Sequence, residues 1–238
     1  MPASAPVKLL AFDCSTETLS VAVQHGSAQW RFTGAGSAQA SHQLIGAAMS
    51  LLGRAGLALD ELDAIVFGRG PGAFTGLRAA CAAAQGLAFG AGVPALPVDT
   101  LLAVAADAHL RHPGTRHWLA LLDARMNEVY AAEYACTSGV WRCTRQPLVC
   151  APENVPLPDA PGAALAGNAF DAYGLRLPAA LAPLQRVPAQ PSAQALLRLA
   201  PALLAAGAAV QAEHALPLYI RNRVALTTAE RLARGGKA

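Results

Sequence analysis

Apolar and polar positions in the first hundred residues predict short strands alternating with amphipathic helices. Strands are expected at five short apolar or alternating runs, which span 9–13, 20–24, 29–33, 63–67 and 93–98. Prolines in the last run favour the edge of a sheet. Ser41 is expected to cap a helix that ends near Leu52, and Thr75 is expected to cap a longer helix over 76–89.

The second half of the chain repeats this pattern in reduced form. Asp13 and Asp123 each end an apolar strand, and each is followed by a polar turn and an alternating strand. A Trp-Arg-x-Thr strand then follows in both copies, at 30–33 and 141–144. A proline-rich stretch begins at Pro152, and it holds no counterpart of the first copy's long helix. The sequence therefore predicts two related lobes, of which the second is smaller.

Composition narrows the class of protein without fixing its function. Of the 238 residues, 54 % are hydrophobic and 14 % are charged, which is typical of an ordered globular protein and argues against disorder. A net charge of +3 is too small to indicate a nucleic-acid binder. The five cysteines form no C-x-x-C pair and are expected to be reduced thiols. We expect no signal peptide and no membrane span, and hence a cytoplasmic protein.

The two acids and the polar turn after the first are the first candidates for chemistry. An acid at the carboxyl end of a strand faces the crevice in which α/β sheets bind ligands. Asp13 and Asp123, with Ser15 and Thr16, could therefore hold Mg²⁺ and nucleotide phosphates between the lobes. Alternatively, each aspartate only caps its own turn through backbone N–H groups.

The glycine-rich loop at 68–78 joins a buried strand to a long helix. Gly70 and Gly72 permit close backbone approach, and Thr75 stands at a helix start, where an anion is favoured. The loop has neither the Lys-Ser/Thr pair of a Walker loop nor a G-x-G-x-x-G string. It is either a phosphate-binding loop or a tight connection with small residues for packing.

Two predicted helices carry apolar or small side chains that another helix could approach closely. These side chains form either plain core or a surface for a partner subunit. The candidate interface residues are Leu44, Ile45, Ala48, Leu52, Ala79, Ala80, Ala83, Ala84 and Leu87.

Signals for a metal site or a nucleophile are poor. His109 and His112 are three residues apart with no carboxylate in register, and neither H-E-x-x-H nor H-x-x-x-H occurs. No Gly-x-Ser-x-Gly elbow is present. We therefore expect no metal site and no catalytic residue.

Several strings resemble the TsaB family. They are Leu10-Ala-Phe-Asp-Cys-Ser-Thr16, Gly68-Arg-Gly-Pro-Gly-Ala-Phe-Thr-Gly-Leu-Arg78, Gln85-Gly-Leu-Ala-Phe-Gly90, Asp123-Ala-Arg-Met-Asn-Glu-Val-Tyr130 and Leu218-Tyr-Ile-Arg-Asn222. The resemblance runs from about Leu9 to Asn222, with the Pro-rich stretch poorly matched. Cys14 departs from it, because the family usually has Thr there.

The resemblance implies an α/β fold of duplicated actin-like, ribonuclease H-like lobes, each built on a β-β-β-α-β-α-β unit, with the second lobe reduced. We place the amino-terminal lobe at 1–102 and the reduced lobe at 103–216. The carboxy-terminal helix of the reduced lobe, expected from about 192 to 209, can pack back on the first lobe. The segment 217–238 contains a basic tail, expected from Arg221 onward.

The resemblance also implies the partners. A TsaB-like subunit pairs with TsaD, its catalytic homologue, joins the ATPase TsaE, and forms homodimers in isolation through the two helices named above. The complex transfers threonylcarbamoyl to the tRNA adenosine beside the anticodon. ATP or ADP and Mg²⁺ are then expected only in the complex, with no cofactor intrinsic to this chain.

Two other functions fit the sequence less well. An ATP- and Mg²⁺-dependent phosphotransferase of the same superfamily would use Asp13 and Asp123, but the reduced second lobe counts against it. A peptidase would need a zinc helix or a nucleophile–base pair, and the sequence offers neither. The basic tail could contact tRNA, although a solvated tail is the simpler interpretation.

Overall fold

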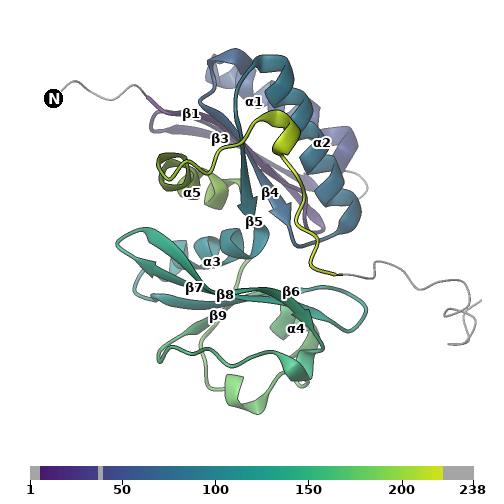
Figure 1. Ribbon diagram of the computed structural model, residues 1–238, viewed down its shortest axis with the longest axis vertical. Helices are drawn as coiled ribbons and strands as arrows, with labels where there is room; N and C mark the ends of the chain where they lie inside the picture. The colour runs from purple at the N-terminus through teal and green to yellow at the C-terminus, as the bar shows by residue number, and fades with distance from the viewer. Residues whose placement is uncertain (1–5, 37–39, 222–238) are drawn as a thin grey trace, which may run out of the picture.

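The computed structural model, which describes residues 6–36 and 40–221, contains two mixed five-stranded sheets (Figure 1). The elements of the first half are β1 Lys8–Asp13, β2 Thr18–His25, β3 Ala28–Ala35, α1 Ala40–Ala55, β4 Ala64–Gly70, α2 Phe74–Ala91, β5 Ala95–Asp99 and α3 Thr100–Arg111. Those of the second half are β6 His117–Asp123, β7 Val129–Thr137, β8 Val140–Cys150, β9 Ala164–Gly167, α4 Ala169–Tyr173, β10 Arg186–Pro188 and α5 Ala193–Ala205.

The two sheets have the same topology, which confirms the duplication. Strands run β3-β2-β1-β4-β5 in the first sheet and β8-β7-β6-β9-β10 in the second. In each, the first three strands form an antiparallel meander, and the last two join it in parallel. The α/β class with duplicated actin-like, ribonuclease H-like lobes is therefore confirmed.

The second lobe is the smaller one, as expected. The first sheet is served by α1 of 16 residues and α2 of 18 residues. In the second copy, a 3₁₀ turn at Pro152–Asn154 lies between β8 and β9, and α4 has only 5 residues. One face of the second sheet is therefore covered by short elements and loops, among them Val155 after the 3₁₀ turn, Phe170 of α4 and Leu181 of a 3₁₀ turn at Ala179–Leu181.

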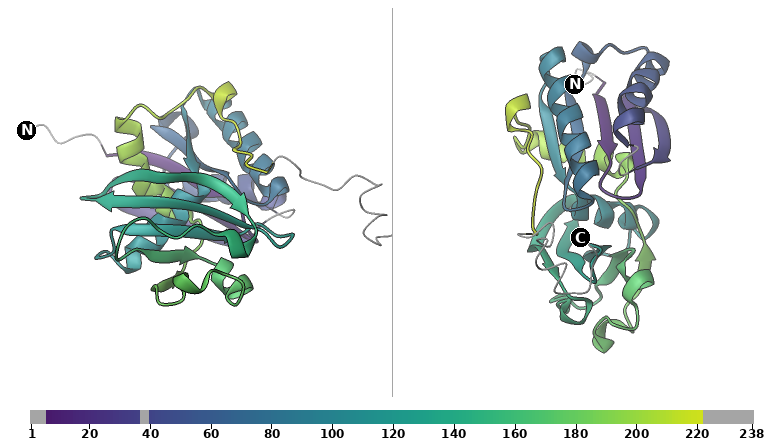
Figure 2. Two further views of the ribbon diagram at one scale, coloured as in Figure 1. Left: turned by 60° about the horizontal axis from the view of Figure 1, so that its bottom comes forward. Right: turned by 90° about the vertical axis from the view of Figure 1, so that its right-hand side faces the viewer.

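Helices cover both faces of the first sheet, and α3 lies between the two sheets (Figure 1; Figure 2). The helices α1 and α2 pack on one face around Phe12 and Phe67. On the other face, α5 packs against the side of β1 and β2 that carries Leu9 and Ala22. The helix α5, which follows the second sheet in the chain, thus packs on the first lobe. The proposed domain limits at 102 and 216 remain predictions.

Helix caps are where the expectation was wrong. The helix α2 begins at Phe74 after Ala73, so Thr75 lies within the first turn and is exposed. The amide of Ala73 donates to the carbonyl oxygen of Ser15 at 2.7 Å, a tertiary contact that sets the helix start earlier. Ser41 likewise lies inside α1, which already includes Ala40.

Over the described ranges, no helix has both the length and the apolar character that a membrane span requires.

Candidate functional site

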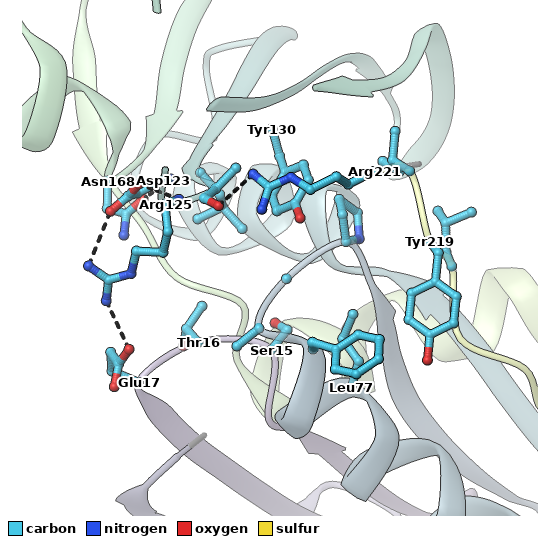
Figure 3. A pocket seen from close by; sticks show the side chains of 18 of the residues that line it. Ser15, Thr16, Glu17, Leu77, Asp123, Arg125, Tyr130, Asn168, Tyr219 and Arg221 are labelled. Carbon is cyan, nitrogen blue, oxygen red and sulfur yellow. Dashed lines mark hydrogen bonds and ion pairs between the residues drawn. The ribbon is translucent and has the colours of Figure 1, made fainter. Parts of the chain in front are cut away.

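A pocket of about 320 Å³ lies between the two lobes, where the carboxyl ends of β1 and β6 meet the start of α2 (Figure 3). Its volume is at the small end of the range for ligand sites. The pocket is lined from the first lobe, from the β6–β7 turn and the ends of neighbouring strands in the second lobe, and from the segment that follows residue 217. The lining residues are Ser15, Thr16, Glu17, Pro71, Gly72, Ala73, Phe74, Leu77, Leu122, Asp123, Ala124, Arg125, Met126, Tyr130, Asn168, Gln190, Leu218, Tyr219, Ile220 and Arg221.

Asp13 is buried and does not line the pocket, although Ser15, two residues further on, does. Its Oδ1 accepts hydrogen bonds from the backbone N–H of Ser15 at 2.8 Å and from the Ser15 hydroxyl at 2.6 Å. Its Oδ2 has no hydrogen-bond partner in the described part of the chain, and it faces Gly68, where a Cβ would come within 1.8 Å. Burial raises the pKa of Asp13 to about 6, against a smaller opposing effect of the Ser15 bonds.

Asp123 does line the pocket, but its carboxylate is also engaged by its own turn. Its Oδ1 accepts from the backbone N–H of Arg125 at 2.7 Å and from the Tyr173 hydroxyl at 2.8 Å. The Asn168 side-chain oxygen accepts from the backbone N–H of Asp123 at 2.9 Å. Both acids therefore accept from the amide two residues ahead, which is the turn-capping arrangement.

The β6–β7 turn presents Arg125 to the first lobe across the mouth of the pocket. Arg125, Met126 and Asn127 have φ values of 58°, 54° and 61°, so three successive residues adopt the left-handed conformation. This turn carries the Arg125 guanidinium to Glu17, at 2.8 Å, on the opposite lobe (Figure 3). Both side chains are largely exposed, so the ion pair contributes little to stability, on the order of 0–1 kcal/mol.

The glycine-rich loop holds the turn after β1 instead of leaving an open cradle. Gly72 lies against Ser15, where an added Cβ would meet the Ser15 carbonyl oxygen at 2.5 Å. Gly70 has a φ of 113° and donates its N–H to the Thr100 hydroxyl at 3.1 Å. Small residues are thus required here for packing, whatever else the loop does.

The structure divides the seven candidate ligand residues into two groups. Ser15, Thr16, Gly72 and Asp123 line the pocket. Asp13, Gly70 and Thr75 do not. Several polar lining residues were not predicted, although four of them, Arg125, Tyr130, Tyr219 and Arg221, lie in strings that resemble the TsaB family. The omitted polar residues are Glu17, Arg125, Tyr130, Asn168, Gln190, Tyr219 and Arg221.

The side chains of His109 and His112 contact other residues of the fold. The His109 ring lies edge-on to Trp118 and Trp141, and its Nδ1 is 3.0 Å from the Thr115 carbonyl oxygen. His112 is within 3.1 Å of the Gln185 amide. Among the residues that the structure describes, no three His, Cys, Asp or Glu side chains are grouped so as to hold a metal ion.

The nine candidate interface residues differ in how deeply their side chains are buried. The side chains of Leu44, Ala48, Leu52, Ala80 and Ala84 lie inside the chain's own core, at 1 % exposure or less. They cannot form a contact surface while α1 and α2 keep their places, so this part of the expectation is corrected. Ile45 is exposed, and the remaining three, Ala79, Ala83 and Leu87, are half-buried.

Known proteins resemble this chain in both sequence and fold. Residues 35–229 match the family model described as TsaD, tRNA N6-adenosine threonylcarbamoyltransferase. The chain is 34 % identical over 224 residues to the tRNA threonylcarbamoyladenosine biosynthesis protein TsaB of Escherichia coli, covering 92 % of this chain and 96 % of that protein. A shorter match, 40 % identical over 125 residues and 52 % of each chain, is to the TsaB of Haemophilus influenzae. The solved structure of YeaZ from Pseudomonas aeruginosa superimposes with a TM-score of 0.82 at 40 % identity, covering 90 % of this chain and 99 % of that one.

Proposed function

The chain belongs to the TsaB family of tRNA threonylcarbamoyladenosine biosynthesis proteins, and from this we propose that it serves tRNA modification as a non-catalytic subunit. In this role it binds TsaD, helps to recruit TsaE, and acts in the cytoplasm. Threonylcarbamoyl is transferred to the tRNA adenosine beside the anticodon by the complex, and this chain contributes binding and orientation. ATP or ADP and Mg²⁺ belong to the assembled complex.

The orientation of the two acids is the observation that supports a non-catalytic role. A phosphotransferase would need both carboxylates directed at a shared metal and the phosphates. Here Asp13 is fully buried, with Ser15 on one oxygen and Gly68 against the other. Asp123 accepts bonds from its own turn and from Tyr173. The geometry therefore favours a scaffold over the phosphotransferase alternative.

Reconstitution tests this proposal directly. The purified chain alone is expected to leave tRNA unmodified, because in this proposal the transfer is carried out by TsaD. Adding it to TsaD, TsaE, threonylcarbamoyl-AMP and ATP is expected to restore adenosine modification that the mixture lacks without it, measured by mass spectrometry of digested tRNA. Full modification by TsaD and TsaE alone would refute the proposal, as would turnover by this chain unaided.

The exposed apolar residues of α1 and α2 are the surface that we assign to TsaD, or to a second copy of this chain in its absence. Ile45 and Met49 on α1 are 42 % and 47 % exposed, and Phe89 on α2 is 80 % exposed. The two helices contact each other, so these side chains belong to neighbouring elements of one layer. Three large exposed apolar side chains on two contacting helices support this assignment, whereas single exposed apolar residues elsewhere need no such explanation.

Replacing Phe89 by aspartate is expected to weaken the association with TsaD at least about tenfold, because a charge would be buried where an aromatic ring packs. Titration calorimetry of the two purified proteins measures the change. Leu175→Asp is the matched control, since Leu175 is fully exposed on the second lobe, outside α1 and α2. Equal weakening by both variants, or by neither, would remove the α1/α2 surface from the proposal.

Only the first residue of the predicted basic tail lies within the residues that the structure describes. Residues 222–238 lie outside the described residues, and their contact with tRNA stays a prediction. Arg221, the first residue of that predicted tail, is bound to the second lobe through Ala124 and Glu128. It is therefore part of the folded body, which corrects the starting point of the tail.

A further inference from the structure

Residues 215–221, which we name the interlobe clasp, run from beside α2 to the second sheet (Figure 1, yellow). At its start, the Ala215 carbonyl oxygen accepts from Cys81 Sγ at 2.6 Å and from the Gln85 amide at 3.2 Å. Further along, the Leu218 amide donates to the Arg69 carbonyl oxygen at 2.7 Å. The first part of the clasp is therefore anchored to α2 and to the end of β4.

Tyr219 fastens the middle of the clasp to the start of α2. Its ring lies 5.6 Å from that of Phe74, and its hydroxyl accepts from Arg78 Nε at 3.2 Å. The Arg78 guanidinium also lies over the Phe74 ring, at 3.9 Å from its centre. Up to this residue, every one of these contacts is with the first lobe.

The last two residues of the clasp belong to the second lobe. Ile220 packs against the core cluster that contains Tyr130. Arg221 Nη2 donates to the Ala124 carbonyl oxygen at 2.8 Å and pairs with Glu128, while the guanidinium lies 5.9 Å from the centre of the Tyr130 ring. Its side chain is only 16 % exposed, so these bonds are poorly accessible to competing water.

The backbone beside the pocket packs closely against the clasp and restricts its position. An added Cβ at Gly70 would come within 2.8 Å of the Leu218 carbonyl oxygen. Leu218, Tyr219, Ile220 and Arg221 all line the pocket between the lobes (Figure 3). The clasp is thus at once a wall of the pocket and a bridge across it.

We infer that the interlobe clasp closes the pocket on the side of α2, while α3 joins the lobes behind it, and that the contacts of Arg221 keep the clasp closed, so that Arg221 is its latch. When Arg221 leaves Ala124 and Glu128, the clasp stays attached to α2 at Ala215, and the pocket opens on that side. The exposed pair between Glu17 and Arg125 bridges the same lobes, but as a solvent-exposed pair it does not hold them. The latch, and not this pair, therefore controls opening. This inference concerns the isolated chain and does not depend on the proposed role in tRNA modification.

Amide-resolved hydrogen exchange of the full chain tests the latch. In Arg221→Ala, the Leu218 amide is expected to exchange at least about tenfold faster than in the parent protein, since its bond to Arg69 is protected only while the clasp is closed. The amide of Ala73, beside the pocket, is expected to follow. Amides of β6, such as that of Leu121, are expected to keep their rates. Glu128→Gln, a milder change at the same contact, is expected to act in the same direction.

Glu17→Gln is the matched control, because it removes the exposed bridge and leaves the clasp intact. It is expected to change the exchange of Leu218 by less than about twofold. The latch is overturned if Leu218 keeps its rate in Arg221→Ala and Glu128→Gln, if Glu17→Gln accelerates it as much, or if β6 accelerates equally. Should Arg221→Ala not fold, the Glu128→Gln result decides by the same criteria.

Discussion

Replacing Gly76 by alanine is expected to lower the free energy of unfolding by about 3 kcal/mol. Gly76 is buried in the first turn of α2, and a Cβ there would stand 1.8 Å from the Cys14 carbonyl oxygen. The obstacle is backbone, so no rotamer change can relieve it. Either α2 or the turn after β1 must move, and the contact between Ala73 and Ser15 would be lost with that movement.

Gly86→Ala is the control for this substitution, because Gly86 is an exposed residue of the same helix with no atom within 4 Å of its added Cβ. It is expected to stabilise the protein by up to about 1 kcal/mol, as alanine favours a helix interior. Urea denaturation of both variants measures the difference. Similar stabilities for the two would mean that α2 does not press on the Cys14 turn.

Strands were the part of the fold that the sequence predicted well. Apolar runs such as 9–13 became buried strands, in that case β1 Lys8–Asp13, because burial on both faces of a sheet demands continuous apolar side chains. The repeated order of strand, acid, turn and strand also anticipated the shared topology of the two sheets. These features depend on local pattern, which a single sequence contains.

Features that depend on contacts between distant segments were missed. Thr75 has the side chain of a cap, yet α2 starts earlier because the amide of Ala73 finds the Ser15 carbonyl oxygen. The apolar stripe on α1 was equally ambiguous, since Leu44 is buried against the sheet while Ile45, its neighbour, is exposed. The packing of the helix decides which residues of a broad apolar stripe enter the core and which stay exposed. The sequence alone does not show this.

The pocket shows the same limit for the site. Asp13 and Asp123 occupy corresponding places in the two copies, but one is sealed by Gly68 and the other borders the pocket. Arg221 reaches the pocket from the far end of the chain, where its basic surroundings suggested a solvated tail. Neither difference has a local signature, because both come from how the two lobes and the clasp meet.

Relative to Asp13→Asn, the protein is expected to lose about 2.4 kcal/mol of stability as the pH rises from 4 to 7. Burial raises the pKa of Asp13 from 3.8 to about 6 in the folded state, so folding favours the neutral carboxyl group. Its contribution is complete below about pH 4, is lost as the pH rises through 6, and leaves a charged carboxylate buried at neutral pH. Asparagine cannot ionise, so the variant lacks this component.

The difference in unfolding free energy between the parent protein and Asp13→Asn, measured by urea denaturation at several pH values, isolates this one group. Costs that do not depend on pH, such as a poorly paired asparagine amide, cancel from the slope. Ser15→Ala is expected to move the loss to higher pH, because the Ser15 hydroxyl bond lowers the pKa of Asp13 against the larger effect of burial. Parallel curves for the parent protein and Asp13→Asn would show that folding does not shift the pKa of Asp13, and would contradict the dominance of burial over the Ser15 bonds. Diverging curves would show that burial sets the ionisation of Asp13, so that its charge at neutral pH costs the fold stability.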